Sequence, residues 1–125
     1  MSQHILFVDD EMPIRETLSI CFKRKGIRVT TAETGEQTLR LCKATSFDLV
    51  ILDVNLGKES GLDLLTYIKD SHPNLPVIIF TSDGDNPELL AEAMAKGAVA
   101  YMSKTESLDT LFKVAQRTMQ PAIAS

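Results

Sequence analysis

Four runs of four apolar residues lie along this chain, each bounded by polar or turn-forming residues. The runs are Ile5–Val8, Leu49–Leu52, Val77–Phe80 and Val99–Met102. Runs of this length and composition predict buried strands, and a further short strand is predicted at Ile27–Ala32. A helical pattern follows each of the five. This alternation predicts an α/β fold: a parallel five-stranded sheet with helices on both faces, because right-handed crossovers place them there.

Capping signals mark where the expected helices begin and end. Thr34 opens the sequence Thr-Gly-Glu-Gln, which has the form of a capping box. Asn86 precedes a proline and a glutamate, a combination typical of a helix start, and Ser107 can cap the last helix. Gly26 and Gly97 are placed to end two of the helices. We therefore expect five β-α units.

Composition bounds the class of protein. The 125 residues suit one domain, expected over 1–120, with 121–125 as a tail or the start of a linker. With 17 acidic against 13 basic residues, we expect no direct nucleic-acid contact by this domain. The N-terminus, Met1–His4, has no charged leader and no apolar run approaches membrane-spanning length, so we expect a cytoplasmic protein without membrane contact. Cys21 and Cys42 are expected to be free thiols.

Chemically useful side chains follow four of the predicted strands. Asp9 and Asp10 follow the first, Asp53 the third, Thr81 the fourth and Lys104 the fifth. Parallel sheets bind ligands outside the carboxyl ends of their strands, which makes these positions candidates for function. The flavodoxin-like, doubly wound strand order 2-1-3-4-5 is expected because it makes strands one and three neighbours and gathers the three acids. Acidic oxygens suit a divalent cation, while a hydroxyl and a fixed ammonium suit a phosphoryl group.

These residues, in this order, resemble the receiver domain of two-component response regulators. The resemblance extends from Ile5 to about Met119 and includes Gly97-Ala98 and Tyr101. It implies a phosphorylation-switched signalling domain, an aspartyl phosphoprotein, rather than an enzyme with a separate substrate. Catalysis would be limited to its own phosphorylation and dephosphorylation. The implied phosphodonor is a histidine kinase or a phosphotransfer protein.

The resemblance also assigns roles within the site. It implies that Asp53 accepts the phosphoryl group, and that Asp10, Asp53 and the backbone carbonyl of Asn55 ligate Mg²⁺, with Asp9 acting mainly through water. Thr81 would bond one phosphoryl oxygen. Lys104 would pair with another.

Four residues, two of them already in this set, are expected to tune the phosphorylated state or transmit it. Asn55 and Asp83 each lie two residues past a strand-end site residue, so we expect them to set the lifetime of the phosphorylated state. Tyr101, with Thr81, is expected to form the switch. The expected output surface comprises the helix Pro87–Lys96, the fifth strand and the helix Ser107–Met119, and its basic residues are Lys96, Lys113 and Arg117. It could serve an output domain, a partner protein or a homodimer.

Two residues depart from the family pattern. Gly57 stands where members usually carry proline, and Thr105 stands where they carry a cis proline after the lysine. A cis peptide before a residue other than proline costs about 2.5–4 kcal/mol. We therefore expect a trans Lys104–Thr105 bond with a rearranged turn.

Other classes fit the sequence less well. A haloacid-dehalogenase-like phosphatase would need a second aspartate where Asn55 stands, and a flavodoxin would need a glycine- and hydroxyl-rich loop after the first strand. The phosphate-binding motif of mononucleotide hydrolases is absent from the sequence. The remaining alternative is a pseudo-receiver, a protein-binding module that has the fold without the phosphoryl switch.

Overall fold

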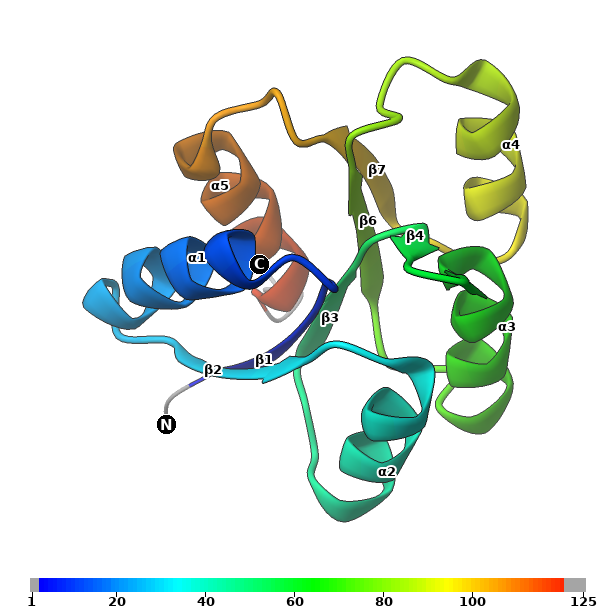
Figure 1. The fold of residues 1–125 in the computed structure, drawn as a ribbon. Coiled ribbons are helices and arrows are strands. Elements are labelled where there is room, and N and C mark those ends of the chain that lie inside the picture. Colours follow the sequence, from blue (N-terminus) through cyan, green and yellow to red (C-terminus); the bar gives the residue numbers. More distant parts are fainter. Residues whose placement is uncertain (1–2, 121–125) are drawn as a thin grey trace, which may run out of the picture.

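Five parallel strands form the central sheet in the computed structural model, which describes residues 3–120 (Figure 1). Their order is β2-β1-β3-β6-β7. Their bounds are β1 His4–Val8, β2 Arg28–Ala32, β3 Leu49–Leu52, β6 Val77–Thr81 and β7 Ala100–Ser103. This is the predicted order 2-1-3-4-5, so the flavodoxin-like topology is confirmed. The tail predicted at 121–125 lies outside the described residues.

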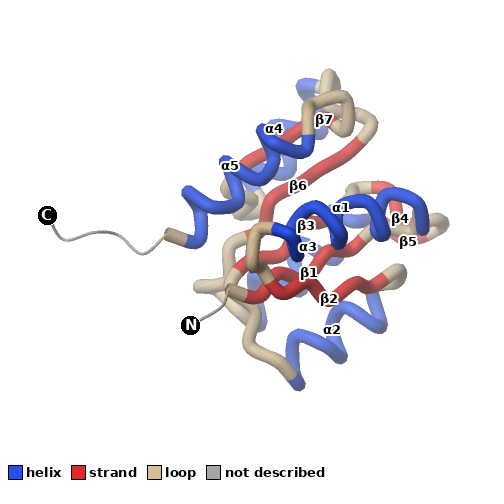
Figure 2. Tube along the Cα trace, turned by 90° about the vertical axis from the view of Figure 1, so that its left-hand side faces the viewer, coloured by secondary structure: helices blue, strands red, loops and turns tan. Residues whose placement is uncertain are grey.

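Five helices cover the two faces of the sheet. They are α1 Met12–Arg24, α2 Gly35–Ala44, α3 Gly61–Ser71, α4 Pro87–Ala95 and α5 Leu108–Met119. Helices α1 and α5 lie on one face, while α2, α3 and α4 lie on the other (Figure 1). In Figure 2, which is turned by 90°, α1 and α5 lie in front of the strands. Along residues 3–120, no helix combines the length and apolar composition needed to cross a bilayer.

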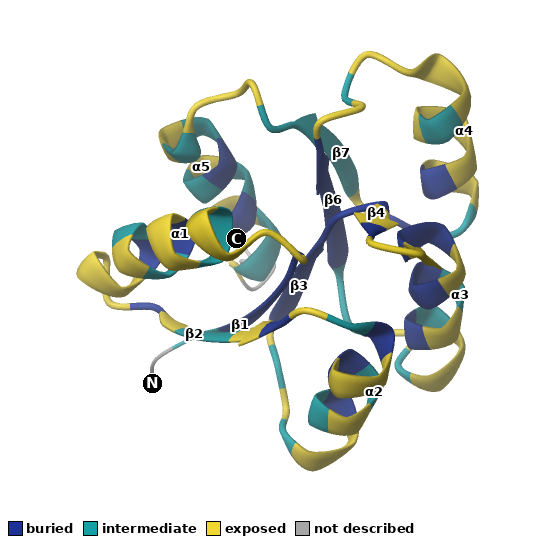
Figure 3. Cartoon of the chain, viewed as in Figure 1, coloured by how far each residue is buried: buried dark blue, intermediate teal, exposed yellow. Residues whose placement is uncertain are grey.

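The sheet separates two hydrophobic cores. Successive side chains of a strand point to opposite faces, so Ile5 and Phe7 of β1 pack with α1 and α5, whereas Leu6 and Val8 pack on the side of α2, α3 and α4. The central strands β1, β3 and β6 are buried along their whole length except at the half-buried His4, which begins β1 (Figure 3). Each large apolar side chain buried in this way contributes about 1.5–3 kcal/mol. These cores fix where the strands end.

The predicted helix starts are confirmed, with one change of partner. Thr34 Oγ1 accepts a hydrogen bond from the backbone N–H of Gln37 at 3.1 Å. The Gln37 side chain reaches back to the N–H of Glu33, at 2.9 Å, rather than to that of Thr34 as a capping box requires. Asn86 and Ser107 cap α4 and α5 through their side-chain oxygens. Each cap satisfies a backbone N–H that the helix itself leaves unpaired.

Glycines with positive φ mark three turns among the described residues. Gly26 (φ +83°) and Gly97 (φ +106°) follow α1 and α4, as predicted. Gly57 (φ +63°) lies in the turn of a small hairpin formed by β4, Asn55–Leu56, and β5, Glu59–Ser60. This hairpin was not predicted from the sequence, because strands of two residues show no hydrophobic period.

The turn after β7 has the predicted trans geometry. No cis peptide bond occurs within residues 3–120, so the Lys104–Thr105 bond is trans. Ser103 Oγ accepts a hydrogen bond from the backbone N–H of Thr105 at 3.1 Å, which stabilises the local turn. The N–H of Lys104 donates to the carbonyl oxygen of Thr81 at 2.8 Å. This bond extends the β6–β7 pairing and fixes the backbone from which the lysine side chain leaves.

The start of α3 makes a close backbone contact that can be tested. A Cβ at Gly61 would collide with the carbonyl oxygen of Asp53 and lie 2.6 Å from Val54 Cα. We expect Gly61→Ala to lower the free energy of unfolding by about 3 kcal/mol, because backbone cannot swing aside as a side chain can. Gly26→Ala is the control: its space is open and only the positive φ is strained, so a loss of about 1 kcal/mol is expected. Urea unfolding followed by circular dichroism measures both, and equal losses would contradict the contact.

Candidate metal centre and phosphoacceptor site

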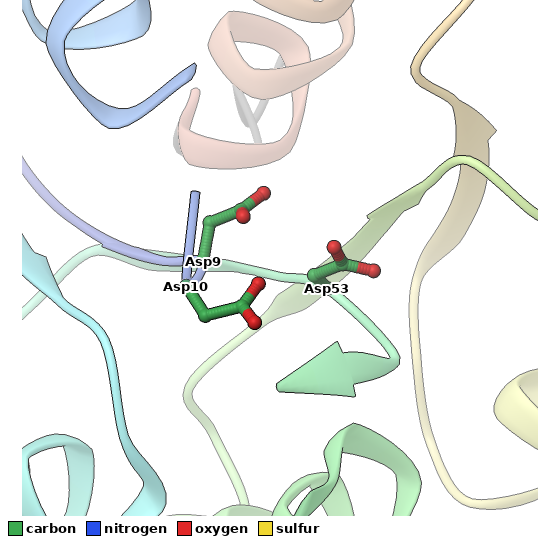
Figure 4. A group of neighbouring side chains, drawn as sticks. All are labelled: Asp9, Asp10 and Asp53. Atoms are coloured by element: carbon green, nitrogen blue, oxygen red, sulfur yellow. The ribbon is translucent and has the colours of Figure 1, made fainter. Parts of the chain in front are cut away.

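Three carboxylates meet at the carboxyl edge of the sheet, as the sequence predicted. Strands β1 and β3 are neighbours with Val8 opposite Leu52, so the residues that follow them lie side by side. Asp9, Asp10 and Asp53 each offer a carboxylate oxygen, and these oxygens all lie within 4.8 Å of one another. Figure 4 shows the three side chains gathered between the ends of β1 and β3. Asp9 and Asp53 are buried, whereas Asp10 is exposed.

Lys104, which follows the edge strand β7, also reaches this cluster. Its Nζ lies 2.7 Å from Asp53 Oδ2 and 2.8 Å from Asp9 Oδ2. Burial alone would lower the pKa of Lys104, but its hydrogen bond to Asp53 and its ion pair with Asp9 outweigh that effect and raise the pKa. Lys104 therefore stays charged at neutral pH. The placement of this lysine, predicted from the sequence as a strand-end cation, brings it directly against the two buried acids.

Asp9 is the least well satisfied acid of the cluster. Burial raises its pKa, although Lys104 and the backbone N–H of Glu11 oppose the shift. Its Oδ1 accepts the Glu11 N–H at 2.9 Å. Its Oδ2 is buried and has the ion pair with Lys104 but no aligned hydrogen bond within the described part of the chain. Taken out of water, such an oxygen favours a further positive partner.

The donor set fits a divalent cation. Three carboxylates lie close together and a single ammonium group contacts two of them, so the charges of the cluster sum to about two negative units. Carboxylate oxygens are the ligands that Mg²⁺ prefers, and Mg²⁺ commonly keeps several waters beside one or two carboxylates. Asp10, the exposed acid, leaves such waters room. A cluster of this kind is typical of the Mg²⁺ site of receiver domains.

Asp83 forms hydrogen bonds with three other residues that were predicted from the sequence to act in the site. Its backbone N–H donates to Thr81 Oγ1 at 3.3 Å, and its Oδ2 accepts a hydrogen bond from Asn55 Nδ2 at 3.1 Å. Its carbonyl oxygen accepts the hydroxyl of Tyr101 at 2.7 Å. Burial raises the pKa of Tyr101, so this hydroxyl remains a donor at neutral pH. The loop after β6 thus contacts the turn after β3, the buried threonine and the tyrosine of β7.

Arg15 also contributes to the site and was not predicted. Its guanidinium donates to the carbonyl oxygen of Asp9 at 2.7 Å and lies 3.6 Å from the carboxylate of Glu33. The arginine therefore links the backbone between β1 and α1 to Glu33, the residue that follows β2. Its sequence context is that of an ordinary exposed position in the first turns of a helix, so nothing marked it in advance.

Comparison with known proteins agrees with this geometry. The family model for the response regulator receiver domain matches residues 5–116, and the chain belongs to that family. It is 33% identical over 110 residues to the transcriptional regulatory protein GlrR of Escherichia coli, covering 88% of this chain and 24% of GlrR. It is 31% identical to the transcriptional regulatory protein FixJ of Bradyrhizobium diazoefficiens, covering 98% of this chain and 60% of FixJ.

A solved structure shows the same fold. The receiver domain of NtrX from Brucella abortus superimposes with a TM-score of 0.87 at 33% identity, covering 94% of this chain and 99% of that domain. The chain spans about a quarter of the length of the first curated relatives it matches. The family match and the shared fold together identify the chain as a receiver domain of two-component response regulators. The function of such a domain is phosphorylation-switched signalling. The findings do not favour the pseudo-receiver alternative.

The buried acid leads to a prediction about pH. Because the folded state raises the pKa of Asp9, the unfolded chain releases this proton first as pH rises, and the folded state loses stability through that range. Asp9→Asn should therefore stabilise the domain at pH 7 in a chelating buffer, with the gain vanishing below the ordinary pKa of aspartate, about 3.9.

Urea unfolding at the two pH values provides the measurement. Asp10→Asn is the matched control: this acid is exposed and keeps its hydration, so a smaller gain at pH 7 is expected. A loss of stability in Asp9→Asn at pH 7 would mean that the ion pair with Lys104 outweighs the burial of the carboxylate.

Proposed function

We propose that Asp53 accepts a phosphoryl group from the phosphohistidine of a histidine kinase or phosphotransfer protein, in a reaction that depends on Mg²⁺. The observation that carries this proposal is the Asp53 carboxylate itself, which is buried among two other acids and held by Lys104 at 2.7 Å. A carboxylate is already charged at pH 7, so no general base is required. Its oxygen attacks phosphorus, the P–N bond breaks, and the imidazole leaves with the electron pair.

The residues that would hold Mg²⁺ are Asp10, Asp53 and the backbone carbonyl of Asn55, with Asp9 acting mainly through a water molecule. The bound cation would reduce the repulsion between an anionic nucleophile and an anionic phosphoryl group. Asp53 Oδ1 accepts the backbone N–H of Asn55 at 3.1 Å, which ties the acceptor to the turn that carries the proposed carbonyl ligand. This coupling supports a shared role for the two residues.

Lys104 and Thr81 would bind the transferred group. Lys104 now pairs with Asp53 Oδ2, and once a phosphoryl group is attached, its ammonium would pair with a phosphoryl oxygen instead. Thr81 is buried at the end of β6, and its hydroxyl would donate to another phosphoryl oxygen. The domain acts on its own side chain, so we infer catalysis of its own phosphorylation and dephosphorylation and no separate substrate.

The first test is direct labelling. In the presence of Mg²⁺ and acetyl phosphate, we expect one phosphoryl group per chain, on Asp53, detected by intact-mass measurement. Asp53→Asn should abolish the label, because an amide is not a nucleophile of this kind. Asp63→Asn, which removes an exposed acid in the first turn of α3, is the control and should label normally. Stoichiometric label on the Asp53 variant would overturn the assignment.

The hydrogen bond between Asn55 and Asp83 leads to a second test. It joins the loops after β3 and β6, and the two side chains would overhang the phosphoryl group and restrict the path of hydrolytic water. We expect Asn55→Lys and Asp83→Ala to change the dephosphorylation rate of phospho-Asp53 severalfold, with little effect on its formation. Decay of label after removal of the donor measures this. Unchanged decay in both variants would refute the overhang.

We further propose that phosphorylation is transmitted through Thr81 and Tyr101 to the surface formed by α4, β7 and α5. As Thr81 moves its hydroxyl toward the phosphoryl group, space opens behind β6, and Tyr101 turns into it. Contact of both residues with Asp83 supports this route. The surface carries exposed apolar residues on α4, Leu90 and Met94, beside its basic residues Lys96, Lys113 and Arg117. An output domain, a partner protein or a second copy would bind there.

Spectra of the backbone amides test this route. Such a switch has two states separated by only a few kcal/mol, so Tyr101 should already exchange between them without phosphate. Addition of the phosphate mimic beryllofluoride should shift the NMR signals of Tyr101 and of α4 as well as those around Asp10 and Asp53. Shifts confined to the loops around the acids would refute the route and favour another face.

A further inference from the structure

Glu59 makes a contact that the proposed reaction does not use. Its carboxylate extends from β5 to Gly35, the first residue of α2, where the backbone N–H lies 3.0 Å from Oε2 and 3.3 Å from Oε1. The first N–H groups of a helix lack partners within the helix, and this end carries partial positive charge. Thr34 already satisfies the N–H of Gln37, so Glu59 supplies an acceptor that the helix's own cap does not.

The hairpin that carries Glu59 flanks the exposed side of the acid cluster. In the pairing of β4 with β5, Asn55 faces Ser60 and Leu56 faces Glu59. A Cβ added at Gly57, in the turn, would lie 3.7 Å from Asp10 Oδ2. The hairpin therefore includes Asn55 at the start of β4, and its turn, at Gly57, lies beside the exposed carboxylate of Asp10.

We infer that Glu59 is a positioning residue for the cation site. Its bond to Gly35 anchors the hairpin to the start of α2, and the hairpin in turn fixes the carbonyl of Asn55 relative to the carboxylate of Asp10. Replacing a group that holds a metal ligand in place typically lowers metal affinity by about 10–100-fold. Glu59 acts without contacting the ion. This inference rests on the proposed function, because Asn55 is a ligand only under that proposal.

Gly35 offers a way to move the carboxylate without changing any charge. A Cβ added there would lie 2.5 Å from Glu59 Oε2 and 3.7 Å from Leu64 Cδ1. The distance to Glu59 Oε2 is too short for two non-bonded atoms. The Glu59 carboxylate, at the end of a flexible side chain, is the group that can move away. Gly35 is not among the residues with positive φ and lies in a helix, so alanine suits its backbone. Gly35→Ala should fold normally and displace Glu59.

The experiment is an Mg²⁺ titration followed by NMR amide shifts of residues around Asp53, on the whole chain and four variants. We expect Glu59→Ala and Gly35→Ala to raise the Mg²⁺ dissociation constant by on the order of tenfold, the low end of such effects, because Glu59 acts on the ligand through the hairpin. Glu59→Gln keeps an acceptor for the Gly35 N–H and should stay closer to the wild type than Glu59→Ala. Glu36→Ala is the control, because it removes the same charge from the first turn of α2 and should bind Mg²⁺ like the wild type.

The chemical shifts of the Gly35 and Asn55 amides report whether the contact itself has been lost. The Asn55 amide should move in Glu59→Ala and Gly35→Ala and remain near its wild-type value in Glu36→Ala. The Gly35 amide is followed in the two Glu59 variants, where residue 35 and its chain neighbours are unchanged, and should move in Glu59→Ala. If Glu59→Ala and Glu59→Gln weaken Mg²⁺ binding equally while Gly35→Ala leaves it unchanged, the effect is one of charge and the positioning role is overturned. Wild-type affinity in all variants overturns it as well. A wild-type chain that binds no Mg²⁺ would instead refute the proposed cation site.

Discussion

The burial of two carboxylates against one lysine is the interaction on which this site depends. Asp9 and Asp53 lie at the ends of adjacent buried strands, where hydration is lost and each negative charge needs a partner. Lys104 contacts both, at 2.8 and 2.7 Å, and so satisfies them only in part. The negative charge that remains favours binding of a divalent cation.

Asp83 connects this electrostatic site to the rest of the domain. Through its amide, carbonyl and side chain it contacts Thr81, Tyr101 and Asn55, which belong to three different segments. A phosphoryl group on Asp53 would disturb the surroundings of Asn55 and Thr81 directly. Tyr101 would respond because its hydroxyl shares the same loop. Under the proposed function, this one short loop would couple the lifetime of the phosphorylated state to the conformation of the proposed output surface.

The identity of the strand-end residues could be predicted because it follows from local patterns, and the order of the strands could be predicted because only neighbouring strands one and three gather the three acids. Apolar runs of four residues mark the strands, and the acid, hydroxyl or lysine after each run lies at the same edge of a parallel sheet. The trans bond at Lys104–Thr105 was also predictable, from the energy of a cis peptide. The hairpin of β4 and β5 was not, because it has no periodic pattern and depends on the positive φ of Gly57. Arg15 was missed because its contacts, with the carbonyl oxygen of Asp9 and the carboxylate of Glu33, leave no mark in the local sequence pattern.

The sequence by itself determined the fold class and which side chains are available at the carboxyl edge of the sheet. Only the tertiary structure decided how these side chains pair. The bonds of Lys104 to Asp53, Asn55 to Asp83 and Glu59 to Gly35 join residues 51, 28 and 24 positions apart. Local hydrophobic periodicity determines secondary structure and burial, and so places strand ends. Contacts over such separations depend instead on the paths of the loops and on the distances that the packed cores leave between them.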